Sequence, residues 1–95
     1  MDLELERPLA VFDLETTGIR IGQDRIVQIA IVRLMPDGTR EKWQTLVNPE
    51  MPIPAEATAV HGISDADVTD APVLADVAAE VLQQLEGCDL CGFNV

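Results

Sequence analysis

The chain has 95 residues, of which 47% are apolar and 3% aromatic, and this is enough for one small domain with an aliphatic core. Six Lys and Arg residues against 17 Asp and Glu residues give a net charge of −11 at pH 7, which excludes a protein that coats nucleic acid or an anionic membrane by charge alone. The short apolar runs, the acidic N-terminus and the two cysteines predict a cytoplasmic protein without a membrane segment, a signal peptide or a disulfide framework.

The first half of the chain predicts three strands. Residues 8–14 (PLAVFDL) are typical of a short buried strand, which Thr-Thr-Gly ends before a loop that runs to Asp24. Residues 26–35 are rich in β-branched side chains and predict the second strand. The turn sequence Pro-Asp-Gly at residues 36–38 then predicts that residues 39–47 return antiparallel to the second strand.

The middle of the chain predicts a loop and two short helical segments. Residues 48–54 contain three prolines, which exclude regular structure. Residues 54–60 are expected to form a short helix that ends at Gly62, because Pro is common at a helix start and Gly just beyond a helix end. Residues 64–67 (SDAD) resemble a capped helical turn.

A longer helix and a fourth strand are expected in the last third. Asp70 is predicted to cap a helix that has Pro72 in its first turn and ends at Gly87. The apolar face of this helix is expected to consist of Val73, Leu74, Val77, Val81, Leu82 and Leu85. Residues 88–92 predict a strand parallel to the first, reached through a right-handed crossover.

The predicted fold class is therefore α/β, a mixed sheet with the order β-β-β-α-β and a helix on one face. One helix leaves the second face of such a sheet uncovered, and the sequence ends at Val95 without a terminal pattern. We expect residues 1–95 to be the N-terminal portion of a single, truncated domain.

Two acids at the end of the first strand are the main candidates for chemistry. Asp13 and Glu15 are two residues apart, so a strand directs both side chains to the same face, opposite to Leu14. Carboxylates at the end of an apolar strand are costly unless they are paired, and no Lys or Arg lies at strand spacing from them. The pair predicts a site for Mg²⁺ or Mn²⁺, whose preferred ligands are oxygens. Taken without its context, an Asp-x-Glu triplet is also compatible with a solvated strand-end acid followed by a turn residue.

The segment FDLETTG (residues 12–18) resembles the first motif of the DEDD exonucleases, the family that includes the proofreading (epsilon) subunit of bacterial DNA polymerase III. Four further segments are similar to that family in the same order. They are DRIVQIA at residues 24–30, NP followed by PIP at residues 48–54, VHGISD at residues 60–65, and GFNV at residues 92–95. Together the matches extend over nearly the whole chain.

The resemblance implies a ribonuclease-H-like fold and a 3′→5′ exonuclease in which four carboxylates and a general base hold two metal ions. Asp13 and Glu15 match the first two acids of the family. Positions that contact the terminal nucleotide are matched by Thr16, Thr17, Glu56, Val60 and His61. The implied partners are a single-stranded 3′ end, of DNA or of RNA, and a DNA polymerase subunit.

The chain also departs from the family pattern. The third and fourth acids and the His or Tyr of the last motif are absent, and Phe93 stands where many relatives have His. Two carboxylates can bind one hydrated ion weakly but cannot define a two-metal site. We therefore expect the isolated chain to be inactive and its full-length parent to be an exonuclease.

Several other residues have less specific interpretations. His61, the only histidine, fits either nucleotide contact or a helix-end position beside Gly62. Cys88 and Cys91 are three apart on a predicted strand and face opposite sides, so we expect apolar packing and not a zinc site. Trp43 is expected to pack in the core. Arg20 and Arg25 are expected either to contact a nucleic-acid backbone or to hold the loop, and the helix acids Asp76, Glu80 and Glu86 to be solvated.

Two other functions are compatible with parts of the sequence. FDLETTG distantly resembles the nucleophile motif of haloacid-dehalogenase-like phosphatases, but the second acid is Glu, the Gly-Thr order is missing, and antiparallel strands do not suit that fold. A nuclease-like module that binds nucleic acid or a partner without catalysis is the other alternative. The intact Asp13 and Glu15 pair argues against it for the parent protein.

Overall fold

The computed structural model describes residues 6–18 and 24–94, and it confirms the predicted order of strands and helices. The elements are β1 (Leu9–Thr16), β2 (Ile26–Leu34), β3 (Arg40–Leu46), α1 (Ala55–His61), α2 (Asp65–Val68), α3 (Leu74–Leu85) and β4 (Asp89–Asn94). The predicted loop before Asp24 falls largely on residues 19–23, which lie outside the described ranges. None of the helices in those ranges has the length and apolar character that crossing a lipid bilayer requires.

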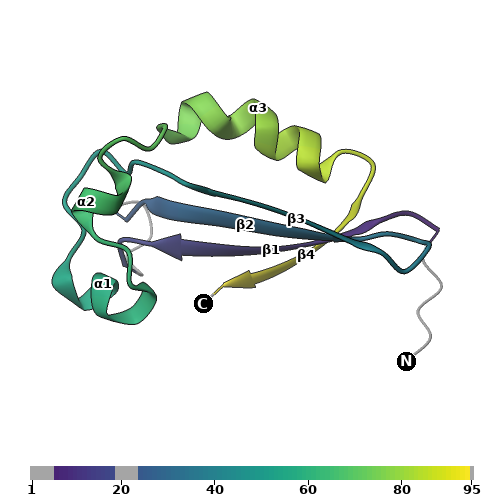
Figure 1. Ribbon diagram of the computed structural model, residues 1–95, viewed down its shortest axis with the longest axis horizontal. Helices are drawn as coiled ribbons and strands as arrows, with labels where there is room; N and C mark the ends of the chain where they lie inside the picture. The colour runs from purple at the N-terminus through teal and green to yellow at the C-terminus, as the bar shows by residue number, and fades with distance from the viewer. Residues whose placement is uncertain (1–5, 19–23, 95) are drawn as a thin grey trace.

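The four strands form one mixed sheet in the order β3-β2-β1-β4. β2 is antiparallel to β3 and β4 is parallel to β1, as the sequence predicts. β2 is also antiparallel to β1. The chain leaves β3 at one edge, crosses one face of the sheet as α3, and returns as β4 beside β1 (Figure 1). β1 is thereby hydrogen-bonded on both sides, which fixes the strand that carries the acidic pair.

The main core lies between the sheet and α3. Its buried residues are Ala10, Ile29, Ile31, Val47 and Val77. Phe12 and Leu14 of β1 pack against this cluster, and so do Val81 and Leu85 of α3, in agreement with the predicted helix face. Leu82 was predicted wrongly as part of that face, since it is 68% exposed. The face of α3 that contacts the sheet is therefore narrower than the spacing of its apolar residues predicts.

A second core closes the end of the sheet at which β1 stops. Its buried residues are Val27, Ile53, Ile63 and Val68, from β2, the proline-rich loop and the region of α1 and α2. A register shift helps to form it: Glu15 lies opposite Gln28 and Thr16 opposite Ile26, so Val27 is an extra residue on β2. Figure 1 shows α1 and α2 gathered at this end of the sheet, next to the tip of β1.

The predicted cap of the long helix is wrong. α3 begins at Leu74 and its N-cap is Val73, so Asp70 does not cap it. The N–H of Asn48 donates to the carbonyl of Pro72 at 2.8 Å, and Val73 forms a parallel bridge with Asn48. Pro72 also disfavours helical backbone at the residue before it. Pro72 and Val73 are therefore not helical, and α3 begins only after the bridge between Val73 and Asn48.

Asp67 makes the stability of α2 dependent on pH. Its carboxylate accepts hydrogen bonds from the Ser64 N–H at 2.9 Å and the Ser64 hydroxyl at 3.0 Å. These bonds lower the pKa of Asp67, with the backbone bond as the larger cause. A carboxyl whose pKa is lower when folded contributes stability above its unfolded pKa, and this contribution is lost as the pH falls through its folded pKa.

We expect Asp67→Asn to lower the free energy of unfolding at pH 7 and to have a progressively smaller effect below about pH 4. Urea unfolding of both proteins at pH 7 and pH 3 measures the difference. Asp70→Asn, an exposed acid in the following turn, is the matched control. A difference between wild type and Asp67→Asn that is equal at both pH values would contradict this assignment.

Candidate metal site at the end of β1

β1 separates its apolar and acidic side chains onto opposite faces of the sheet. Phe12 and Leu14 pack against the core beneath α3, so the alternation of the strand places Asp13 and Glu15 on the other face. Their neighbours on β2 are Ala30 and Gln28, which carry no charge. Within residues 6–18 and 24–94, no Lys or Arg forms an ion pair with either acid. Nothing in that part of the chain neutralises the pair.

Asp13 has an unsatisfied carboxylate oxygen. Its Oδ1 is buried and has no hydrogen-bond partner among the residues that the structure describes. Such an oxygen is costly in a folded protein unless a donor or a cation meets it. A divalent cation fits this position, because it prefers carboxylate oxygens and Glu15 lies on the same face of the strand.

The described part of the chain supplies only a partial set of ligands. It contains no group of three or more His, Cys, Asp or Glu residues arranged to hold a metal ion. Asp13 and Glu15 could contribute two carboxylates to an ion whose other ligands are water or substrate oxygens.

Thr17 is buried in the protein and does not face outward. Its side chain is 1% exposed. The Thr17 hydroxyl donates to Asp24 Oδ1 at 2.8 Å and accepts from the Arg25 N–H at 2.9 Å. The Thr17 N–H donates to the Arg25 carbonyl at 2.8 Å. These bonds join the end of β1 to the start of β2, so Thr17 closes the base of the intervening loop.

The neighbours of Thr17 have different surroundings. Thr16 is half-buried, and its hydroxyl donates to the Gly18 carbonyl at 2.5 Å. A Cβ added at Gly18 would lie 2.7 Å from Asp24 Oδ2, which is too close for any larger residue while that carboxylate holds Thr17. The Thr-Thr-Gly sequence therefore combines one partly accessible hydroxyl, one buried hydroxyl and one position without room for a side chain.

α1 presents two of the predicted contact residues to solvent. Glu56 is exposed, and Val60 is 77% exposed. His61, at the end of the helix, is half-buried and uses both ring nitrogens inside the protein. Its Nδ1 accepts from the Ile63 N–H at 3.0 Å, and its Nε2 lies 3.0 Å from the Thr16 carbonyl oxygen. Among the predicted contact residues of α1, His61 thus reaches the end of β1.

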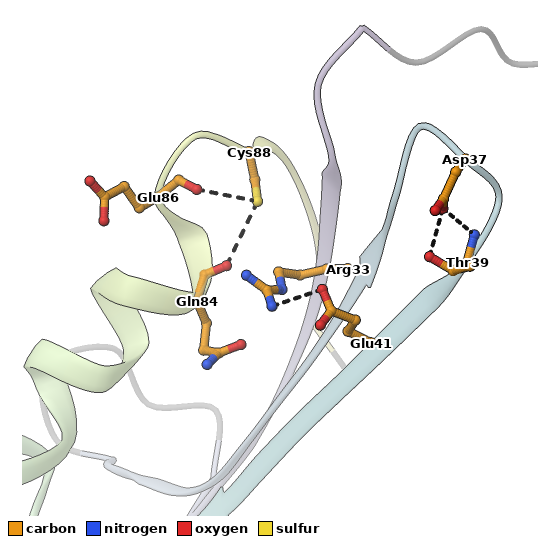
Figure 2. Close-up of polar contacts among 7 residues, drawn as sticks. All are labelled: Arg33, Asp37, Thr39, Glu41, Gln84, Glu86 and Cys88. Carbon is orange, nitrogen blue, oxygen red and sulfur yellow. Dashed lines mark hydrogen bonds and ion pairs between the residues drawn. The ribbon is translucent and has the colours of Figure 1, made fainter.

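Most of the remaining candidate residues have contacts that support the fold. Cys88 is half-buried beside the main core, and its Sγ approaches the carbonyls of Gln84 and Glu86 at 3.7 Å each (Figure 2). Cys88 packs against the main core, as expected, but it precedes β4 and is not fully buried. The side chain of Cys91 lies outside the described part of the structure. Trp43 packs against the main core, as expected.

The charged candidates that the structure describes either hold a loop in place or are exposed to solvent. Arg25 Nη1 donates to the Pro49 carbonyl at 3.2 Å, so this arginine holds two loops together. Arg20 lies outside the described residues. The helix acids are exposed, as predicted: Asp76, Glu80 and Glu86.

Sequence reasoning missed the role of Asp24 as the acceptor for Thr17. The sequence contained one signal for it, the position of an acid directly before Arg25 at the start of the second strand. The ion pair between Arg33 and Glu41, at 2.9 Å across β2 and β3 (Figure 2), was also not predicted.

Known proteins with a similar sequence or fold include one polymerase-subunit-like relative and two solved structures. The chain is 50% identical over 88 residues to a DNA polymerase III subunit epsilon-like protein of Rhodobacter capsulatus, an alignment that covers 88% of this chain and 12% of the relative. Among solved structures, an ExoI/SSB-Ct complex matches with a TM-score of 0.77 at 19% identity, over 95% of this chain and 21% of that one. Exonuclease X in complex with 5′ overhanging duplex DNA matches with a TM-score of 0.64 at 29% identity, over 92% and 58%.

These likenesses confirm the predicted ribonuclease-H-like mixed sheet. The chain spans about an eighth of the length of the epsilon-like relative. A family model described as Exonuclease matches residues 10–94, which is nearly the whole sequence. The chain therefore belongs to the exonuclease family.

Proposed function

We propose that residues 1–95 form the N-terminal part of a metal-dependent 3′→5′ exonuclease domain that removes nucleotides from DNA ends during proofreading or repair. The observation that carries this proposal is the buried Asp13 Oδ1, which has no hydrogen-bond partner among residues 6–18 and 24–94 and lies on the same strand face as Glu15. Membership of the exonuclease family and the similarity to an epsilon-like protein support it.

Asp13 and Glu15 are proposed to hold Mg²⁺ or Mn²⁺. A divalent ion at such a site lowers the pKa of a coordinated water and stabilises the charge that develops on the phosphodiester. The protein supplies two carboxylates on a strand that is hydrogen-bonded on both sides. The uncharged neighbours Ala30 and Gln28 leave the negative charge of the pair available for the cation.

The terminal nucleotide is proposed to lie between the end of β1 and α1. Thr16, Glu56 and Val60 are accessible enough to contact it. Thr17 and His61 belong to the same proposed set, but their polar atoms are engaged within the protein, so their contribution would come mainly from holding the surrounding backbone. The proposed partners are a single-stranded 3′ end and, by analogy with the epsilon-like relative, a DNA polymerase subunit.

The test is a comparison of the full-length protein with the isolated chain on single-stranded DNA labelled at its 5′ end. We expect the full-length protein to shorten the DNA stepwise from the 3′ end in Mg²⁺, and Glu15→Gln to be slower by at least about 100-fold. The isolated chain is expected to release no nucleotides. An RNA strand of the same sequence establishes which sugar is preferred.

Asp76→Asn, which removes an exposed acid of α3, is the control for the change in charge and should keep the wild-type rate. Full activity in EDTA, or shortening from the 5′ end only, would refute the proposed function. Metal-dependent release of nucleotides by the purified 95-residue chain would disprove the expected inactivity.

A further inference from the structure

His61 occupies an unusual position because its ring joins two elements of the proposed site. Nδ1 accepts the Ile63 N–H at 3.0 Å, on the helix side. Nε2 lies 3.0 Å from the carbonyl oxygen of Thr16, the residue that follows Glu15 at the end of β1. The two residues it contacts are 47 positions apart in the sequence, so the ring forms a direct connection between α1 and the acidic strand.

The hydrogen bonds determine the tautomer of the ring. Since Nδ1 accepts a hydrogen bond, it carries no proton, and Nε2 must carry the proton that is donated to the Thr16 carbonyl. In this arrangement neither nitrogen is free to take a proton from water or to coordinate a cation. The role of His61 must therefore come from what its ring holds in place.

The segment on the α1 side of this connection is itself well fixed. Gly62 ends the helix with a left-handed backbone, and its N–H donates to the Thr58 carbonyl at 2.7 Å. The Thr58 hydroxyl donates to the Ile63 carbonyl at 2.8 Å, and the side chain of Ile63 is buried in the core that closes this end of the sheet. The ring thus extends from a rigid turn to the end of β1.

We propose that His61 is a positioning residue that sets the distance between the exposed face of α1 and the Asp13 and Glu15 carboxylates. This inference rests on the proposed function and deepens it, because Glu56 and Val60 on α1 would contact the terminal nucleotide while the carboxylates act on its phosphodiester. A bond from Nε2 to the strand keeps these two parts of the site in register. A small misplacement of a bound substrate greatly lowers the reaction rate.

Two substitutions separate the contacts of the ring. In His61→Gln, the amide nitrogen can take the place of Nε2 and donate to the Thr16 carbonyl. In His61→Asn, the amide oxygen can take the place of Nδ1 and accept from Ile63, but no donor reaches Thr16. Both variants remove an imidazole, so a general base or a metal ligand would be lost equally from each.

In the full-length protein we expect His61→Gln to stay within about threefold of wild type in kcat/KM for a single-stranded DNA end. His61→Asn is expected to lose about tenfold or more, with an increase in KM as well as a decrease in kcat, because both binding and alignment of the nucleotide depend on the connection. A decrease in folded fraction would lower kcat and leave KM unchanged. Equal losses in both variants, or a better His61→Asn, would overturn the proposal.

A second measurement does not depend on nuclease activity. The ¹⁵N chemical shifts of the His61 ring in the 95-residue chain report which nitrogen carries the proton. We expect Nε2 to be protonated and Nδ1 to be unprotonated at pH 8. A proton on Nδ1 would overturn the inference, whereas the absence of nuclease activity from wild type would refute only the proposed function.

Discussion

Asp13→Asn is expected to raise the free energy of unfolding of the metal-free protein by about 1 kcal/mol while lowering the exonuclease rate of the full-length protein by about 10³-fold. The two effects have one origin. Asp13 Oδ1 is buried without a hydrogen-bond partner in the described part of the structure, so its charge is unfavourable until a cation is bound. A neutral amide of the same shape removes that cost and, with it, the ligand.

Urea unfolding in EDTA measures the first effect, and the rate of nucleotide release in Mg²⁺ measures the second. Added Mg²⁺ should then stabilise wild type and leave Asp13→Asn unchanged, since a ligand stabilises only the protein that binds it. Glu41→Gln is the matched control, because Glu41 is a strand acid that is already paired with Arg33 at 2.9 Å. A variant that is less stable than wild type in EDTA would show that the Asp13 carboxylate is needed for folding and not for a metal.

Thr17→Val is expected to lower the free energy of unfolding by about 2 kcal/mol, although the two side chains have nearly the same shape. The change removes the hydroxyl that donates to Asp24 and accepts from the Arg25 N–H. A buried donor or acceptor that loses its partner costs about 1–3 kcal/mol. The end of β1 would then be held less firmly to the start of β2.

Thermal and urea unfolding of Thr17→Val and Thr16→Val make the comparison, since Thr16 is half-buried and its hydroxyl donates to the nearby Gly18 carbonyl. Thr16→Val should cost less than about 1 kcal/mol. Gly18→Ala should also destabilise, because its Cβ would displace Asp24, and the double variant should cost less than the sum of the two single changes. Equal effects at Thr16 and Thr17, or full additivity, would contradict a shared role of Asp24.

The features that follow from local chemistry could be predicted from the sequence. The β-branched run of β2, the Pro-Asp-Gly turn and the proline-rich loop each define their own conformation. The alternation of Asp13, Leu14 and Glu15 also gave the orientation of the acidic pair, because a strand has only two faces.

The features that the sequence does not predict depend on contacts between distant segments. Asp70 was expected to cap α3, but the bridge between Asn48 and Val73 delays the helix. Leu82 has helical spacing with its apolar neighbours, yet the stripe that meets the sheet is too narrow to include it. No local pattern could show these contacts, since each depends on where another part of the chain lies.

The same limit applied within the candidate site. The family resemblance matches Thr17 and His61 to nucleotide contacts. The sequence does not reveal that the Thr17 hydroxyl is hydrogen-bonded to Asp24, or that His61 Nε2 is hydrogen-bonded to the Thr16 carbonyl. Two residues of one motif, Thr16 and Thr17, therefore have different surroundings. The structure divides the predicted contact residues into those that face solvent and those whose polar atoms are hydrogen-bonded within the protein.

We expect Asp13 and Glu15 to bind one divalent cation together, and Mn²⁺-induced broadening of amide NMR signals in the 95-residue chain tests this. At low Mn²⁺ concentrations, we expect broadening to centre on residues 13–16 and on Ala30, the neighbour of Asp13 on β2. Either Asp13→Asn or Glu15→Gln should abolish it. Broadening that persists unchanged in both variants, or that centres on the exposed acids Asp76 and Glu80 of α3, would contradict the claim.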